Sequence, residues 1–214
     1  MPVVYKLDPA DPDDSALKEA AQLIRAGKLV IYPTETFYGL GALYCNEQAL
    51  EKIFQIKGRQ KDKPLLLLIP DIACLYRLAY TVPEQAMALV QKFWPGPLTL
   101  LFTASAELSD LLIGNKVKVG CRISSNPVAQ GLLSHLKEPL TSTSSNASEG
   151  RSPTRIDEIP AQLIDSVDLI IDAGETSGGL PSTVFDLSER PFTVMREGAI
   201  PAKVIFETLG PAQK

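Results

Sequence analysis

The segment Lys57–Pro64 gathers positive charge in a chain whose formal net charge is −4. Its first seven residues contain four basic side chains and one acidic side chain. Several cations presented by one loop can neutralise a phosphate or a carboxylate, and arginine does so with a fixed fork of donors. An ordinary solvated turn is the alternative interpretation, and the segment alone leaves both open.

Polar loops with complementary chemistry are predicted at Thr34–Gly41, Ser142–Gly150 and Gly174–Thr183. Ligands of open α/β sheets collect outside the strand ends, so these loops and Lys57–Lys63 are expected to line one cavity. The candidate cations are Lys57, Arg59, Lys63, Arg122 and Arg196, and the short polar side chains are Thr34, Ser142, Ser144, Asn146, Ser182 and Thr183. This inventory favours an anionic ligand with several functional groups, such as a nucleotide. A capping role is the alternative for each serine or threonine.

The sequence lacks the motifs and residue groups that several other chemistries require. It contains neither Gly-x-x-x-x-Gly-Lys-Ser/Thr nor Gly-x-Gly-x-x-Gly, the two common phosphate-binding motifs. His135 is the single histidine, which argues against a Ser-His-Asp hydrolase. No paired acids stand out as metal ligands, although Mg²⁺ held mainly by substrate phosphates would leave little trace.

Apolar periodicity and capping residues predict an α/β fold in which a twisted mixed sheet carries flanking helices. Helices are expected at 13–27, 46–56, 83–93, 127–136 and 202–209, and strands at 29–32, 65–69, 98–102, 117–123, 140–142 and 167–171. A hairpin is expected to join 182–187 to 192–196. Neither an internal repeat nor a linker is apparent, so we expect one domain over residues 1–214.

Composition is that of an ordinary globular protein, with 45% hydrophobic and 21% charged residues. No apolar run approaches the roughly 20 residues that cross a bilayer, and the N-terminus lacks the layout of a signal peptide. The three cysteines suit a reducing cytoplasm better than a disulfide framework. Mild acidity argues against wholesale coating of nucleic acid, while a local basic patch stays possible.

Six segments, in this order, resemble the YrdC-like family: Tyr32–Gly41, Lys57–Arg59, Trp94–Thr99, Ser142–Asn146, Pro181–Val184 and Arg196–Gly198. The resemblance extends from about Leu17 to Gly198. It implies a twisted α/β sheet folded around a large, positively lined concave cavity. It also implies threonylcarbamoyl-AMP synthase activity, in which L-threonine, bicarbonate or CO₂, and ATP give the mixed anhydride and pyrophosphate. The product then passes to a partner enzyme that modifies the adenosine beside the anticodon of certain tRNAs.

The resemblance also implies roles for particular residues. Lys57 and Arg59 are implied to hold the ATP phosphates as the catalytic cations, and Mg²⁺ is expected to accompany ATP. Their implied helpers at the nucleotide are Ser144, Asn146, Ser152 and Arg196, with the strand backbone near Lys118 at the adenine. The implied neighbours of threonine or its carbamate are Thr34, Lys63, Arg122, Ser142 and Ser182.

The chain departs from the family pattern at three places. Gln60 replaces a common proline, Ser145 replaces the alanine of Ser-Ala-Asn, and 122–127 lacks a frequent histidine and is similar to the YciO branch. Two alternatives therefore accompany the synthase: a non-catalytic module that binds tRNA or double-stranded RNA, and a YciO-like paralogue with weak synthase activity. The extra C-terminal domain of longer synthases is expected to be absent.

Overall fold

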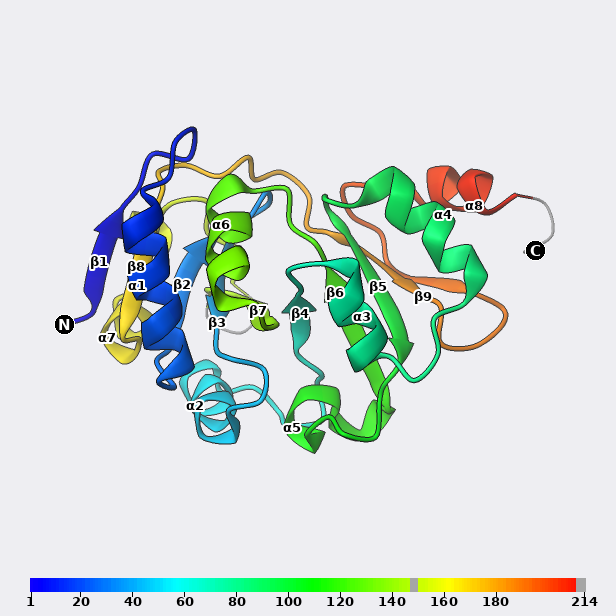
Figure 1. Cartoon of the computed structure of the whole chain (residues 1–214), viewed down its shortest axis with the longest axis horizontal. Helices are drawn as coiled ribbons and strands as arrows, with labels where there is room; N and C mark the ends of the chain where they lie inside the picture. The colour runs from blue at the N-terminus through cyan, green and yellow to red at the C-terminus, as the bar shows by residue number, and fades with distance from the viewer. Residues whose placement is uncertain (147–149, 211–214) are drawn as a thin grey trace.

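A single mixed sheet organises the protein in the computed structural model, which describes residues 1–146 and 150–210. Its ten strands are β1 (Val3–Lys6), β2 (Val30–Pro33), β3 (Tyr38–Gly41), β4 (Leu66–Leu68), β5 (Leu98–Thr103), β6 (Lys118–Arg122), β7 (Leu140–Ser144), β8 (Leu169–Asp172), β9 (Thr183–Asp186) and β10 (Thr193–Arg196). They lie in the order β1-β8-β2-β3-β7-β4-β6-β5-β9-β10, with both parallel and antiparallel neighbours. The first strand, β1, and the last strands, β9 and β10, belong to opposite ends of the sheet, and β1 and β9 lie far apart in Figure 1. The predicted twisted mixed α/β sheet is confirmed.

Helices flank this sheet (Figure 1). They are α1 (Asp14–Arg25), α2 (Glu47–Lys57), α3 (Ile72–Leu78), α4 (Glu84–Phe93), α5 (Asp110–Ile113), α6 (Pro127–Leu136), α7 (Ala161–Ser166) and α8 (Ala202–Leu209). Side-chain caps start several of them, as at Asn46, whose Oδ1 accepts from the Ala49 amide at 3.0 Å. The five predicted helices are confirmed, whereas α3, α5, α7 and β1 were not predicted. Across the described residues, every helix is too short or too polar to cross a membrane.

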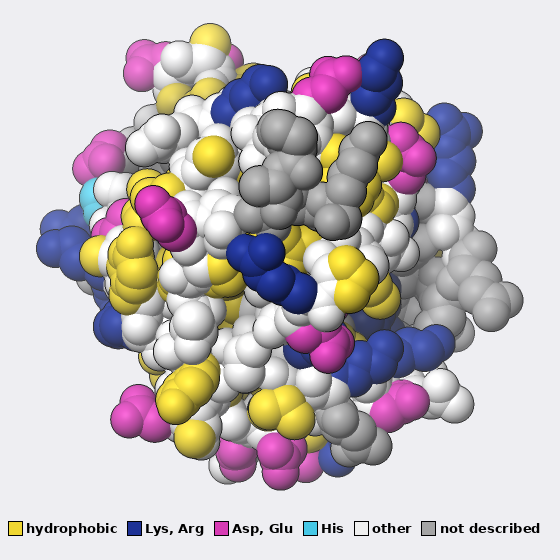
Figure 2. Space-filling model, turned by 90° about the vertical axis from the view of Figure 1, so that its right-hand side faces the viewer, with side chains coloured by type: hydrophobic (Ala, Val, Ile, Leu, Met, Phe, Trp, Pro, Cys, Tyr) yellow, Lys and Arg dark blue, Asp and Glu magenta, His cyan; other side chains and the backbone are white. Residues whose placement is uncertain are grey.

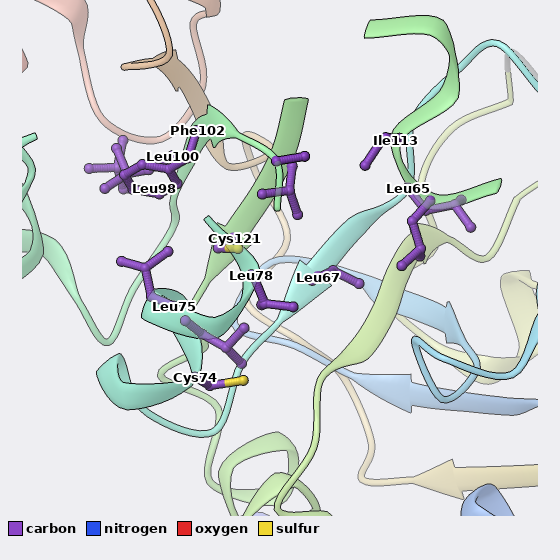
Figure 3. Packing of buried hydrophobic residues seen from close by; sticks show 14 of the residues in the cluster. Leu65, Leu67, Cys74, Leu75, Leu78, Leu98, Leu100, Phe102, Ile113 and Cys121 are labelled. Carbon is purple, nitrogen blue, oxygen red and sulfur yellow. The ribbon is translucent and has the colours of Figure 1, made fainter. Parts of the chain in front are cut away.

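Two hydrophobic clusters hold the layers together. The smaller cluster packs α1 and α6 against β2 and β8. The larger cluster includes Leu67 of β4, Leu100 of β5 and Cys121 of β6, with Leu75 and Leu78 of α3 lying against them (Figure 3). Burial in both clusters explains the continuous apolar run at β2, because Val30 enters the smaller cluster and Ile31 the larger.

Side chains alternate between the two faces of the strands and leave one face free for polar groups. In β6, Val119 and Cys121 enter the larger cluster, so Lys118, Gly120 and Arg122 lie on the opposite face. We call this opposite face, from β3 across β7, β4, β6 and β5 to β9, the open face. It is the part of the sheet that positions the site described below.

Residues 38–41 form β3, so the predicted loop over Thr34–Gly41 is wrong for its second half. Tyr38 enters the larger core, and the Tyr32 ring lies against β3 from the other side. A Cβ placed on Gly41 would lie only 2.8 Å from Cε1 of Tyr32. Glycine leaves room for this ring. Because glycine is rare in strand interiors, its presence also prevented the prediction of this strand from the sequence.

The polar run Ser142–Gly150 is likewise not a loop throughout. Its first three residues belong to β7, where Ser144 pairs with Gly39 of β3 and Ser142 pairs with Leu66 of β4. Sheet pairing overrides the turn preference of serine here, because β7 has a partner on each side. The rest of this predicted loop includes residues 147–149, which lie outside the described residues.

The surface at the end of the molecule near α4 and α8 is mixed in charge. Figure 2 shows lysine and arginine side chains there singly or in small groups, interspersed with aspartate, glutamate and hydrophobic side chains. Such a mixture is typical of a solvated surface rather than of a continuous basic face.

Candidate active site

A cavity of about 190 Å³ lies on the open face where β3, β7 and β4 meet. Hydroxyl and guanidinium groups share its lining with aromatic and aliphatic side chains. Its walls are Thr34, Thr36, Phe37, Tyr38, Gly39, Arg59, Pro64, Leu65, Leu66, Arg122, Ser142, Thr143, Ser144, Ser152, Pro181, Ser182 and Arg196. The four predicted loop regions thus contribute to one cavity, as expected.

Three arginines give the cavity its charge. Arg59, just after α2, donates from Nη2 to the Pro64 carbonyl at 3.0 Å. Arg196, at the end of β10, donates from Nη2 to the Ser182 carbonyl at 2.7 Å and to Ser182 Oγ at 3.2 Å. Burial lowers the pKa of both guanidinium groups below their ordinary value, and the charge of Arg122 contributes at Arg196. Clustered, partly desolvated cations of this kind favour a multiply charged anion.

The third arginine, Arg122, forms a nearly buried ion pair with Glu35. Nη1 of Arg122 donates to Oε1 of Glu35, and Oγ of Ser124 donates to Oε2 of the same carboxylate. Only 8% of the Arg122 side chain and 11% of the Glu35 side chain are exposed. Sequence reasoning missed Glu35, although an acid two residues after a buried strand, between two threonines, was the available signal.

Lys57 lies behind the cavity wall rather than in it. Its ammonium donates to the carbonyl oxygens of Ser144 and Asn146, the latter at 2.9 Å, and to Oδ1 of Asn146 at 3.3 Å. Ser144 Oγ donates to the same Oδ1 at 2.6 Å. Burial, and then the charge of Arg59, lower the pKa of Lys57 to about 8. The lysine therefore ties the end of α2 to the polar end of β7.

The turn Thr34–Phe37 is held in shape by its own side chains. Thr34 Oγ1 accepts from the amides of Thr36 and Phe37, each at 3.2 Å, in the manner of a hydroxyl-stabilised turn. The Thr36 carbonyl in turn accepts from Thr176 Oγ1 at 2.9 Å and from the Gly178 amide at 2.9 Å. This turn is thereby fixed against the loop that follows β8, which carries the chain toward Ser182.

The structure brings together eight of the twelve predicted site residues as cavity walls: Thr34, Arg59, Arg122, Ser142, Ser144, Ser152, Ser182 and Arg196. Lys57 and Asn146 form the layer behind Ser144. Lys63 is exposed in the basic segment next to the cavity-lining Pro64. His135 bonds to Asp14 at 2.7 Å, between α6 and α1, and does not line the cavity.

Lys118 belongs to a second hollow of about 310 Å³. Its ammonium is paired with Asp186 at 2.9 Å and with Glu189 at 2.6 Å. The two hollows adjoin, since Pro64 and Leu66 line both. Pro64, Leu66, Leu101 and Met195 form the apolar part of the second hollow, and Lys116, Lys118 and Asp186 form its charged part.

Ser145, one of the departures from the family pattern, has a structural role. Its buried Oγ donates to the Tyr38 carbonyl at 2.8 Å, and its amide donates to the same oxygen at 3.1 Å. The hydroxyl therefore fastens the end of β7 to β3.

The described residues contain no group of three or more histidine, cysteine, aspartate or glutamate side chains placed to hold a metal ion. Within the cavity wall, the chemistry comes from guanidinium, hydroxyl and main-chain groups. Such a set can bind and orient phosphates and carboxylates and can stabilise added negative charge.

Comparison with known proteins agrees with this geometry. A sequence model of the Sua5/YciO/YrdC family, described as "Telomere recombination", matches residues 22–198. The threonylcarbamoyl-AMP synthase of Pyrococcus abyssi is 39% identical over 91% of this chain. The chain spans 57% of the length of that relative.

Two solved structures are similar over nearly the whole chain. P. abyssi Sua5 complexed with L-threonine matches with a TM-score of 0.92 at 36% identity, over 97% of this chain and 61% of that chain. Escherichia coli YciO matches with a TM-score of 0.87 at 30% identity, over 96% of this chain and 100% of that chain.

Proposed function

The chain belongs to the Sua5/YciO/YrdC family, and on that premise we propose that it is an L-threonylcarbamoyladenylate synthase. In this reaction L-threonine, bicarbonate or CO₂, and ATP give threonylcarbamoyl-AMP and pyrophosphate. The observation that carries the proposal is the convergence of Arg59, Arg122 and Arg196 on one hydroxyl-lined cavity. A cavity of this charge suits two anionic reactants bound together.

The amino-acid end of the cavity is proposed at Arg122. Its guanidinium would receive the carboxylate of threonine, with the neighbouring hydroxyls of Thr34, Ser142 and Ser182 positioning the rest of the molecule. Support comes from the relative that was solved with L-threonine. Lys63, exposed beside Pro64, would approach this ligand from the rim.

The nucleotide end is proposed at Arg59 and Arg196, with Ser144 and Ser152 as hydroxyl partners of the phosphates. Lys57 and Asn146 would act from the layer behind, where Lys57 adds positive charge and both hold Ser144 in place. The adenine would occupy the second hollow, against the backbone at Lys118.

The chemistry requires no protein nucleophile. A carbamate oxygen attacks the α-phosphorus while the bond to pyrophosphate breaks, so negative charge grows on the phosphoryl oxygens and on the leaving group. Fixed guanidinium groups stabilise that charge, and binding both reactants in one cavity supplies orientation. Mg²⁺ is proposed to arrive with ATP as part of the substrate, because the carboxylate near the cavity, Glu35, is already paired with Arg122.

The wider setting is proposed on the same basis. The product would pass to a transferase that modifies tRNA in the cytoplasm, in keeping with three free cysteines. We also propose that residues 1–214 form one domain, since a single sheet collects strands from Val3 to Arg196.

Pyrophosphate release from ATP tests the proposal. We expect release that depends on both L-threonine and bicarbonate, with a product of the mass of threonylcarbamoyl-AMP. The likeness to E. coli YciO favours a second candidate, a YciO-like paralogue with weak synthase activity, which would give the same product slowly. No product, together with salt-sensitive binding of tRNA or double-stranded RNA, would instead support a non-catalytic RNA-binding protein.

A further inference from the structure

We infer that Glu35 is the positioning residue for the amino-acid end of the cavity, acting through Arg122. Its carboxylate fixes the Arg122 guanidinium so that the remaining donors face the carboxylate of the substrate. The inference rests on the proposed function. It identifies Glu35 as the residue that orients Arg122, the arginine proposed to bind the amino acid.

The geometry of the pair leads to this role. Glu35 lies two residues beyond the end of β2, while Arg122 is the last residue of β6. Oε1 of Glu35 accepts from Nη1 of Arg122, and both side chains are about nine-tenths buried. A guanidinium has five N–H donors, so this pairing leaves donors for the cavity that Arg122 lines.

Charge within the cavity gives such an anchor a function. Arg122 and Arg196 line the same small space, and the charge of Arg122 is one cause of the lowered pKa of Arg196. The two cations therefore repel each other before any anion binds. Glu35 offsets this repulsion and holds Arg122 in the geometry that an incoming carboxylate needs.

Further hydrogen bonds hold the Glu35 carboxylate and the Arg122 backbone in place. Ser124 donates to the second oxygen of Glu35, accepts from the Asn126 amide at 3.2 Å, and its carbonyl accepts from Gln130 Nε2 at 3.0 Å. The Arg122 carbonyl accepts from the Ile69 amide at 3.0 Å. A carboxylate fixed in this way restricts the guanidinium to a narrow range of orientations, which is what preorganised binding requires.

The test compares Glu35→Gln with the wild-type enzyme in steady-state pyrophosphate release. L-Threonine is varied at saturating ATP, and ATP is varied at saturating L-threonine. We expect the KM for L-threonine to rise at least about tenfold in the variant, while the KM for ATP changes less than about threefold. Glu35→Asp keeps the charge on a shorter side chain, and its KM for L-threonine is expected to lie between those of the wild type and Glu35→Gln.

Glu138→Gln is the matched control. Glu138 also pairs with an arginine, Arg77, at 3.2 Å, but its side chain is 37% exposed and lies outside the cavity walls. This control is expected to leave both KM values unchanged.

A double-mutant comparison tests whether Glu35 acts through Arg122. If it does, Glu35→Gln adds little to the defect of Arg122→Gln, because the residue that it positions is already gone. Additive defects would overturn this part of the inference.

Calorimetric titration with L-threonine gives a second readout that needs no turnover.

Equal rises in both KM values, or a lower melting temperature with unchanged kinetics and threonine affinity, would overturn the inference and leave Glu35 a purely structural residue. If Glu35→Gln does not fold, Glu35→Asp and Ser124→Ala provide the same comparison. Wild-type protein without threonine-dependent pyrophosphate release would refute the proposed function itself, and wild-type protein that also fails to bind L-threonine would refute both.

Discussion

The ammonium of Lys57 contacts Asn146 twice, donating to its main-chain oxygen at 2.9 Å and to its side-chain oxygen at 3.3 Å. This pair joins the last residue of α2 to the polar segment after β7. A positive charge and a structural tie are thereby combined in one side chain that lies just behind the cavity wall.

Replacing Lys57 by alanine is expected to lower kcat/KM for ATP at least about tenfold, which corresponds to more than about 1.4 kcal/mol. The variant loses the charge and leaves the carbonyls of Ser144 and Asn146 without this donor. Initial rates of pyrophosphate release at varied ATP measure the effect. Lys52→Ala, an exposed lysine on the same helix, is the control and should match wild type. Near-normal rates in Lys57→Ala would mean that neither the charge nor the tie matters for the reaction.

The pKa of Lys57 predicts an unusual pH dependence of stability. Burial, followed by the charge of Arg59, lowers that pKa to about 8 in the folded protein from an ordinary 10.5. Between these values the unfolded chain binds more protons than the folded chain, so the unfolding free energy should rise with pH. Urea unfolding of wild type and Lys57→Met at pH 8, 9 and 10 isolates this contribution. Parallel pH profiles for the two proteins would contradict it.

Arg59→Ala is expected to lower kcat/KM for ATP at least about tenfold, because it removes a cavity-lining guanidinium from the proposed phosphate site. Lys61→Ala is a stringent control from the same basic segment. Lys61 is exposed, pairs with Glu51 at 3.4 Å and does not line the cavity, so its loss should change the rate less than about twofold. Equal losses in both variants would indicate that general positive charge, rather than position, is what matters.

The two glycines of β3 should respond differently to alanine. At Gly41 a Cβ would lie 2.7 Å from the Thr141 carbonyl, so Gly41→Ala should destabilise the fold by about 1–3 kcal/mol. At Gly39 the nearest atom is Ser142 Oγ at 3.3 Å, so Gly39→Ala should fold but narrow the cavity and weaken threonine binding. Thermal unfolding together with threonine titration separates the two effects. A Gly41→Ala protein as stable as wild type would contradict the close packing described here.

Much of this architecture could be predicted from local signals. Apolar runs located the buried strands such as β2, and caps such as Asn46 located the helix starts. Charged and hydroxyl residues at strand ends identified most of the cavity, because those residue types have few uses inside a core.

The remainder depends on contacts that local sequence does not reveal. β3 is built from Tyr-Gly-Leu-Gly, and only the Tyr32 ring lying against its glycines explains why that sequence forms a strand. The short helix α3 has too few residues for its period to stand out. Glu35 gains its importance from Arg122, which lies 87 positions later in the chain.

The place of β7 between β3 and β4 has a consequence for the protein during its synthesis. Both neighbours leave the ribosome long before β7 does. The edges of β3 and β4 that pair with β7 therefore stay unpaired until β7 emerges. At roughly 5–20 residues per second the delay amounts to several seconds. Exposed strand edges invite pairing with other chains. The nascent chain should therefore be most prone to pairing with other chains in the interval after β4 has emerged and before β7 is complete.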